Sequence, residues 1–158
     1  MVLRHTWLGL CLLLVSGLVQ AALTIEITQR LDDALPIAVV PFAGITAGDN
    51  TGNIIRADLD RSGRFRSLDP AALPGRPSSS AEMLPGVWQN VAADLVVIGQ
   101  ASKTADGRYS FRYELLKKGG LERVLGETFT VDASRWRDAA HYISDRIYKQ
   151  VTGEPGVF

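Results

Sequence analysis

A short basic start followed by a long apolar run distinguishes the first residues of the chain. Arg4 and His5 precede an apolar run over residues 7–19, which only glycine and serine interrupt, and residues 19–21 place small side chains at −3 and −1 of a cleavage point. This is the pattern of a cleavable secretory signal peptide. The run is also shorter than the ~20 apolar residues of a membrane span. We therefore predict that residues 1–21 are a signal peptide and that the mature chain works outside the cytoplasm.

Directly after this point the pattern changes to strict alternation. Leu23, Ile25 and Ile27 are apolar, whereas Thr24 and Glu26 between them are polar. A period of two predicts a strand with one buried face, or a strand at the edge of a sheet.

Two later runs are apolar at nearly every position and rich in β-branched residues. They cover residues 36–42 and residues 94–100, and the second is prolonged to residue 103. Continuous apolar runs of this length predict interior strands that are buried on both faces. The prolines of the first run lie at its ends, where a missing N–H does not disturb the ladder.

The second half of the chain predicts a meander of strands. Residues 109–115 alternate between apolar and polar, and a hairpin turn ending in Asp106-Gly107 precedes them. Residues 124–131 are expected to be the return strand. Earlier in the chain, a short strand is expected at residues 65–68, followed by a surface loop rich in proline and serine.

Three segments show the apolar spacing of helices. The first covers residues 52–61, with Asp49, Asn50 or Thr51 as its cap, and the second covers residues 81–92, with Pro85 near its start. The buried side of the second is expected to consist of Met83, Leu84, Val87, Trp88 and Val91. The last helix is capped by Asp132 or Ser134 and ended by Gly153 and Pro155, and its apolar stripe consists of Trp136, Ala140, Ile143, Ile147 and Val151.

These elements follow the order β-β-α-β-α-β-β-β-α. Helices and strands alternate in the first half, and a meander follows. This order predicts an α/β fold with a mixed β-sheet and helices packed against it. The roughly 137 residues left after cleavage are enough for one domain with its own core.

Charge argues against several classes of partner. The chain has 17 basic and 17 acidic residues, and loss of Arg4 with the signal peptide leaves the mature form near −1. Nucleic-acid binding and polybasic membrane binding both need a basic excess that is missing here. No run after residue 19 is apolar for long enough to span a bilayer, so no direct membrane span is expected after cleavage.

Cys11 is the chain's only cysteine, and it lies inside the predicted signal peptide. A lipoprotein signal needs a small residue directly before its cysteine, but Leu10 stands there. We therefore predict a plain cleavable signal. The mature chain then has no cysteine for a disulfide, a metal site or a thiol nucleophile.

Candidate catalytic residues are few. His141 lies one helical turn before Asp145, a spacing that could orient an imidazole for base chemistry, but no nucleophile elbow accompanies it. The loop over residues 44–52 follows a strand and precedes a helix, yet it lacks the lysine of a phosphate loop. No calcium-loop or zinc-ligand spacing occurs. We predict no catalytic residue, no metal and no cofactor, and a structural or surface role for His141.

Several motifs occur together in an order that resembles a known family. Each is weak alone, but their order and spacing are specific, and they cover essentially the whole chain. The chain resembles the amino-terminal domain of the TolB family, the periplasmic components of the Tol-Pal system. The motifs are Leu23–Ile27, Pro36–Phe42, Ala57–Leu59 with Ser62–Phe65, Leu68-Asp69, Ala93–Gln100, Asp106–Tyr109, His141-x-x-Ser144-Asp145-x-x-Tyr148, Thr152-Gly153 and Gly156-x-Phe158.

The resemblance implies a division into a signal peptide (1–21), a partner-binding segment (22–33) and an α/β domain (34–158). In the family the mature N-terminus binds the C-terminal domain of TolA. The implied partner-binding residues are Leu23, Thr24, Ile25, Glu26 and Ile27. An alternating strand at a free end is suited to join the sheet edge of a partner. Its other interpretation is an ordinary edge strand of its own domain.

The implied function is that of an interaction component and not of an enzyme. The family serves outer-membrane integrity, envelope constriction during cell division and protein import, including colicin uptake. A β-propeller that contacts the lipoprotein Pal and colicins follows this domain in the family, so Pal binding is expected only where a propeller is present. This chain resembles the amino-terminal domain alone.

Two alternatives remain at this point. One is an outer-membrane assembly or penicillin-binding-protein activator-like periplasmic module, which shares the two apolar strands but is commonly a lipoprotein. The other is an exported enzyme with a histidine-based site, for which His141 is the sole candidate.

Overall fold

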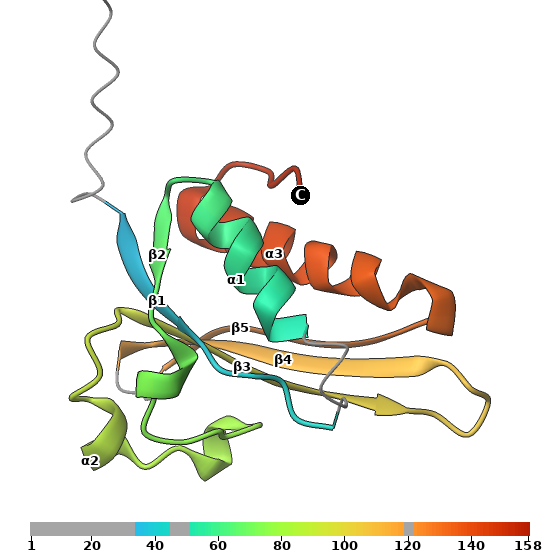
Figure 1. The fold of residues 1–158 in the computed structure, drawn as a ribbon, viewed down its shortest axis with the longest axis horizontal. Helices are drawn as coiled ribbons and strands as arrows, with labels where there is room; N and C mark the ends of the chain where they lie inside the picture. Colours follow the sequence, from blue (N-terminus) through green and yellow to red (C-terminus); the bar gives the residue numbers. More distant parts are fainter. Residues whose placement is uncertain (1–33, 45–50, 119–121) are drawn as a thin grey trace, which may run out of the picture.

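A five-stranded mixed sheet organises the protein (Figure 1). The computed structural model describes residues 34–44, 51–118 and 122–158. The strand order is β2-β1-β3-β4-β5; β1 is parallel to β2 and β3, while the β3–β4 and β4–β5 pairs are antiparallel. The mixed α/β fold predicted from the sequence is confirmed. The strands are β1 (Leu35–Val39), β2 (Phe65–Ser67), β3 (Leu95–Lys103), β4 (Tyr109–Lys117) and β5 (Arg123–Val131).

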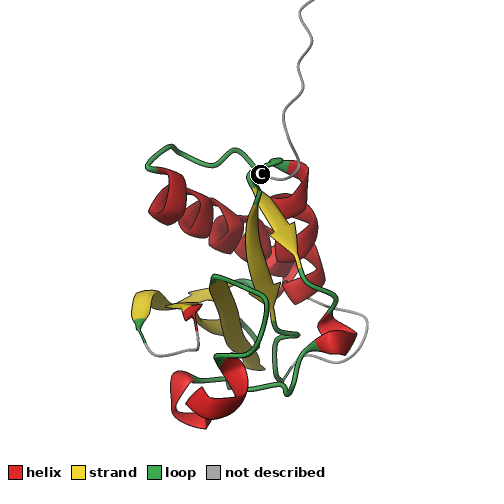
Figure 2. Cartoon of the chain, turned by 90° about the vertical axis from the view of Figure 1, so that its left-hand side faces the viewer, coloured by secondary structure: helices red, strands yellow, loops and turns green. Residues whose placement is uncertain are grey.

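Helices cover the two faces of the sheet unequally (Figure 2). The long helices α1 (Thr51–Arg61) and α3 (Trp136–Thr152) pack on one face, which we call the front. The back face is covered by the segment that contains α2 (Pro85–Trp88) and two 3-10 helices, Pro70–Ala72 and Ser80–Glu82. Covering on both sides produces two separate apolar clusters.

The continuous apolar runs of the sequence become the strands that are buried on both faces. In β1, Ile37 and Val39 face the front cluster, whereas Ala38 faces the back cluster beside Trp88. In β3, alternate residues divide between the two clusters in the same way. Strands covered on both faces need apolar residues at successive positions, which is why these runs do not alternate.

The alternating strands are covered on the front face. Phe111, Tyr113 and Leu115 of β4 are fully buried there. Thr128 and Thr130 of β5 occupy the alternate positions and are exposed. One apolar face and one polar face therefore account for the period of two.

Two expectations about element ends were wrong. The predicted helix over residues 81–92 is only one α-helical turn, Pro85–Trp88; it does not begin earlier because Pro85, its first residue, disfavours a helical residue before it. Leu84 (65% exposed) and Val87 (43% exposed) consequently face outward. The predicted strand over residues 36–42 ends at Val39. Beyond it, Pro41 has no backbone N–H with which to continue the hydrogen bonds of the sheet.

The last helix was predicted correctly except at its start. α3 begins at Trp136 after a 3-10 turn, and neither Asp132 nor Ser134 caps it; Arg135 occupies the N-cap without a side-chain hydrogen bond. Its C-terminus matches the prediction, since Gly153 adopts the left-handed conformation and donates its N–H to the Lys149 carbonyl oxygen. Asp49 and Asn50, the other predicted caps, lie outside the described residues.

Gly99 provides a test of how tightly the sheet is covered. A Cβ atom at this position would lie 2.5 Å from the Phe42 ring and 2.7 Å from the Arg112 carbonyl oxygen. We expect Gly99→Ala to lower the free energy of unfolding by about 1–3 kcal/mol, because backbone and a packed ring must move. Urea unfolding measures this change.

Gly126→Ala is the matched control in the same sheet. A Cβ atom there would meet the flexible Arg123 side chain at 3.1 Å, so we expect a change within about 0.5 kcal/mol. Equal destabilisation by the two substitutions would show that Gly99 is not constrained by its neighbours.

Candidate functional site

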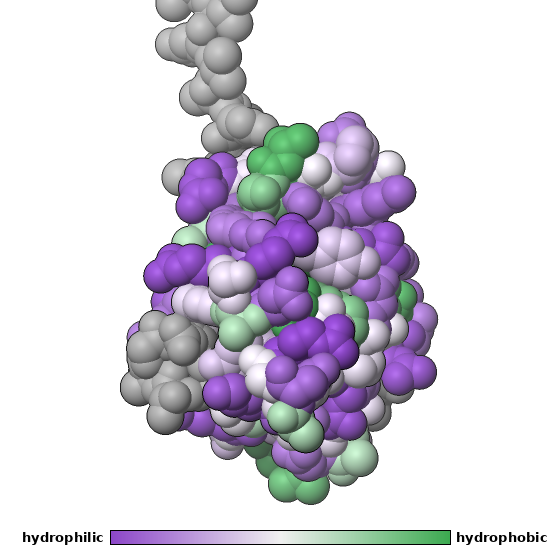
Figure 3. Space-filling view, turned by 90° about the vertical axis from the view of Figure 1, so that its right-hand side faces the viewer, coloured by the Kyte–Doolittle hydropathy of each residue, from purple (hydrophilic) through white to green (hydrophobic). Residues whose placement is uncertain are grey.

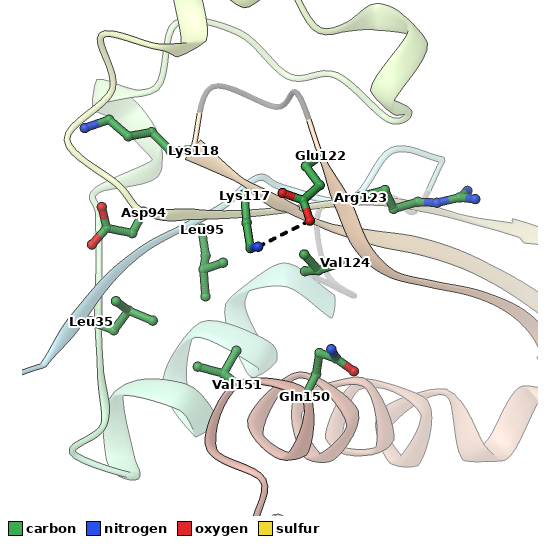
Figure 4. A pocket seen from close by; sticks show the side chains of 10 residues that line it. All are labelled: Leu35, Asp94, Leu95, Lys117, Lys118, Glu122, Arg123, Val124, Gln150 and Val151. Carbon is green, nitrogen blue, oxygen red and sulfur yellow. Dashed lines mark hydrogen bonds and ion pairs between the residues drawn. The ribbon is translucent and has the colours of Figure 1, made fainter.

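A groove opens at one end of the sheet, where β1 begins (Figure 4). It has a volume of about 750 Å³. Four strand or helix ends contribute to it: the start of β1, the start of β3, the turn between β4 and β5, and the last turn of α3. The lining residues are Leu35, Asp94, Leu95, Lys117, Lys118, Glu122, Arg123, Val124, Gln150 and Val151.

The groove has an apolar floor and a charged rim. Leu35, Leu95 and Val124 come from three different strands and face the groove together with Val151 of α3. Lys118 and Arg123 point away from this floor, and Lys117 is paired with Glu122 at 3.2 Å. An apolar floor with polar groups around it suits a peptide segment that carries apolar side chains.

The groove lies where the predicted partner-binding segment joins the domain. Leu35 lines it, and Ala34 is the first described residue. Residues 22–33 therefore enter the described part of the chain at the mouth of this groove. The predicted partner-binding residues, Leu23, Thr24, Ile25, Glu26 and Ile27, lie outside the described residues, so their role stays a prediction.

A second constellation is a buried carboxylate between α1 and α3. The Asp58 side chain is 1% exposed. Its Oδ2 accepts hydrogen bonds from His141 Nδ1 (2.7 Å) and Ser144 Oγ (3.0 Å), and its Oδ1 accepts one from Arg61 (3.1 Å). Because a buried carboxylate must be fully hydrogen-bonded, this cluster joins the two helices at fixed positions.

The partner of His141 is therefore different from the one that the sequence spacing suggested. Its ring contacts Asp58, which is 83 positions away, and Asp145 instead accepts the Phe158 N–H at 3.1 Å. Ser144 directs its hydroxyl to the same carboxylate and not to the imidazole. This arrangement is centred on the acid, so it does not form a nucleophile–base pair. The structural interpretation of His141 fits this geometry.

Sequence reasoning missed Asp58, although a signal was present. Asp58 lies on the same helical face as Ile55 and Leu59, both fully buried. A carboxylate on an otherwise apolar helix face predicts a buried partner. The sequence does not reveal which residue that partner is, because it comes from a distant helix.

The end of the chain packs back against α3. Phe158 contacts Tyr148 edge-to-face with ring centroids 5.8 Å apart, and Tyr148 contacts Phe65 in the same way at 6.2 Å. A Cβ atom added at Gly156 would lie only 2.7 Å from the Cα atom of Asp145, so the tail packs closely on α3 at this point. A cavity of about 330 Å³ adjoins this contact, lined by the tail and the end of α1.

A third polar cluster ties β5 to α3. Glu127 accepts hydrogen bonds from Arg146 Nε (2.8 Å) and the Tyr142 hydroxyl (3.1 Å). Partial burial, and then this hydrogen bond, raise the pKa of Tyr142, while the bond to Glu127 raises the pKa of Arg146. Burial also raises the pKa of the neighbouring Tyr113 phenol. At neutral pH the two tyrosines therefore stay uncharged and Arg146 stays positively charged. The cluster is suited to holding β5 against α3 and not to proton transfer.

The face of the molecule at the β3–β4 hairpin is mostly hydrophilic, with small hydrophobic patches (Figure 3). Within residues 34–44, 51–118 and 122–158, His, Cys, Asp and Glu side chains do not gather in threes that could hold a metal ion. None of the helices in this part of the chain is long and apolar enough to cross a membrane.

Comparison with known proteins gives a consistent result. The family model described as "TolB amino-terminal domain" matches residues 23–117. The Tol-Pal system protein TolB of Alcanivorax borkumensis is 38% identical over 160 residues, which is 98% of this chain. The protein of the same name from Methylococcus capsulatus is 39% identical over 154 residues, or 96% of this chain.

The chain spans just over a third of these curated relatives, 37% and 36% of their lengths. Among solved structures, the crystal structure of TolB from Acinetobacter baumannii is similar, with a TM-score of 0.66 and 37% identity. That match covers 78% of this chain and 29% of the other.

Asp58→Ala tests whether the buried carboxylate joins the helices. It removes the acceptor that His141 and Ser144 share and leaves the Ser144 hydroxyl only the Ala140 carbonyl oxygen of its own helix, so we expect a loss of about 2–3 kcal/mol in the free energy of unfolding. Asp138→Ala is the control, because Asp138 pairs with Arg135 at the surface, where a loss of about 0.5 kcal/mol or less is expected. Urea unfolding that finds the two variants equally stable would contradict this role.

Proposed function

Because the chain belongs to the family of TolB amino-terminal domains, we propose that it is a periplasmic protein–protein interaction component of the Tol-Pal system without catalytic activity. Its processes are those of that system: outer-membrane integrity, envelope constriction during cell division, and protein import, including colicin uptake. The family match favours this function over an outer-membrane assembly or penicillin-binding-protein activator-like module.

The observation that carries the proposal is the alternating segment at the start of the family match. The match begins at residue 23, so it includes Leu23, Ile25 and Ile27. The partner is the C-terminal domain of TolA. These three residues place their side chains on one face of an extended strand, and that face packs on the partner while the backbone pairs with its sheet edge.

The position of the segment supports this role. It precedes the domain at the mouth of the groove beside Leu35, so it leaves the folded part of the chain at a surface site. The domain then acts as the folded base from which a short strand is presented. A strand that adds to a partner needs no preformed pocket in its own domain, because main-chain hydrogen bonds supply much of the affinity.

Contacts with Pal belong to a longer protein. The relatives are nearly three times as long as this chain, and we assign Pal binding only to forms in which a β-propeller follows. The packed tail at Phe158 offers a fixed exit toward such a domain, because its N–H is held by Asp145.

Titration calorimetry against the TolA C-terminal domain tests the proposal. We expect the exported protein, beginning at residue 22, to bind, and a form beginning at Ala34 not to bind. Ile25→Lys removes one apolar side chain from the binding face, which corresponds to a loss of at least about tenfold in affinity.

Thr24→Lys is the matched control, because it adds the same charge to the opposite face of the strand. It should bind within about threefold of the unchanged protein, since its side chain stays in water. Equal binding by the forms beginning at residues 22 and 34 would contradict the proposal, as would equal losses for Ile25→Lys and Thr24→Lys.

A further inference from the structure

The two edges of the sheet differ in their capacity to accept another strand. β2, at one edge, has three residues, and Asp60 already accepts the Ser67 N–H at 2.8 Å. β5, at the other edge, has nine residues without a proline, and one side of its backbone has no partner strand among the residues that the structure describes. Proteins normally cover or interrupt such an edge, because it can pair with another chain.

The hydrogen-bond pattern of the meander determines which backbone groups of β5 face this edge. At the β3–β4 hairpin the Thr104 N–H donates to the Arg108 carbonyl oxygen at 2.9 Å, so these two residues form a hydrogen-bonded pair. Such pairs alternate along an antiparallel ladder, so the even-numbered residues of β4 bond to β3 and the odd-numbered residues bond to β5. Those odd-numbered residues pair with odd-numbered residues of β5. The N–H and C=O groups that point to the open edge are therefore those of Gly126, Thr128 and Thr130.

We propose that two copies of this chain pair through this edge, with β5 antiparallel to β5 of the second copy and a two-fold axis at Thr128. The proposal concerns β5 and α3 and does not depend on binding to TolA. Thr128 then exchanges both of its backbone hydrogen bonds with Thr128 of the second copy, and Gly126 does the same with Thr130 of the second copy. The pairing is self-complementary, as a two-fold symmetric interface requires.

The side chains fit this register on both faces. On the front face, Leu125 lies opposite Val131 of the second copy, and both residues are only partly buried in a single copy. A cavity of about 230 Å³ lies beside Val131, between it and the rings of Phe129 and Tyr142, and the second copy's Leu125 would fill it. On the back face the two Thr128 side chains meet, and Thr–Thr pairs across strands are favourable.

Other registers are less favourable. A two-fold axis at Glu127 would need backbone groups that already bond to β4, and it would set two carboxylates opposite one another. An axis at Thr130 would pair only the last three residues of the two strands. An axis at Gly126 would place the Arg123 side chain opposite Phe129, so the apolar pairs of the front face would be lost.

The charges of α3 are complementary about the same axis. Tyr142 lies level with the axis, because its hydroxyl donates to Glu127 at 3.1 Å and its ring contacts Phe129 with centroids 5.1 Å apart. Asp138 and Arg146 lie one turn before and one turn after Tyr142, on the same side of the helix. The two copies of α3 run antiparallel across the axis, so Asp138 faces Arg146 of the second copy. Opposite charges then meet on both sides of the axis.

Disulfide formation between copies tests the proposal. The protein beginning at residue 22 has no cysteine, so Thr128→Cys introduces a single exposed thiol per copy. At the two-fold axis the two Cα atoms would lie about 5.5 Å apart, a distance that a disulfide bridges. We expect disulfide-linked dimers, measured on a non-reducing gel, to form at least about ten times faster than with Thr130→Cys.

Thr130→Cys is the matched control, because Thr130 is an exposed threonine on the same face of the same strand. In the proposed register the two Thr130 Cα atoms would be about 14 Å apart, too far for a disulfide. Equal rates of dimer formation by the two variants, or a faster rate for Thr130→Cys, would overturn the proposal.

Sedimentation velocity over a series of protein concentrations tests the pairing without a cross-link. We expect the unchanged protein to dimerise as its concentration rises. Thr128→Lys should weaken the dimer at least about tenfold, because two ammonium groups would meet at the axis, whereas Thr130→Lys lies opposite Gly126 and should stay within about threefold. A protein that sediments as a monomer at every concentration, or equal losses for the two lysine variants, would overturn the proposal.

Discussion

The structure depends on the burial of β1 and β3 on both faces. Ile37, Val39 and Val97 need the cover of α1 and α3, whereas Ala38, Val96 and Ile98 need the cover of the segment around Trp88. Burial of apolar surface is the dominant favourable term in folding, so these strands determine which elements must lie above and below them. The two long helices are then joined by a carboxylate, Asp58, which neither helix could bury without the other.

This arrangement leaves the meander less well covered than the central strands. β4 and β5 use their front face for the core, and the back face at Thr128 and Thr130 is exposed. The long edge of β5 is a consequence of the same topology, because no later strand follows it in the described chain. The groove and the open edge of β5 therefore both lie at the margin of the sheet.

Sequence patterns predicted those elements in which the pattern of buried and exposed positions repeats from one end to the other. The apolar runs of β1 and β3, the alternation of β4 and the stripe of α3 each repeat one environment along the whole element. The helix over residues 81–92 was overpredicted, and at its start the constraint from Pro85 outweighs the apolar spacing. The Asp58–His141 contact and the groove were not predictable, since each joins residues that are distant in the chain. The partner-binding segment was inferred from alternation and family resemblance, and it lies outside the described residues.

The central claim is our proposal that residues 23–27 bind the C-terminal domain of TolA as an added strand. Residue-resolved amide hydrogen exchange on the protein beginning at residue 22, with and without the TolA C-terminal domain, tests this claim most directly. The account predicts that the amides of residues 23–27 exchange at least about tenfold more slowly when the domain is added, because they then donate hydrogen bonds to the partner's sheet edge. Amides of residues 23–27 that exchange equally fast in both samples would contradict it.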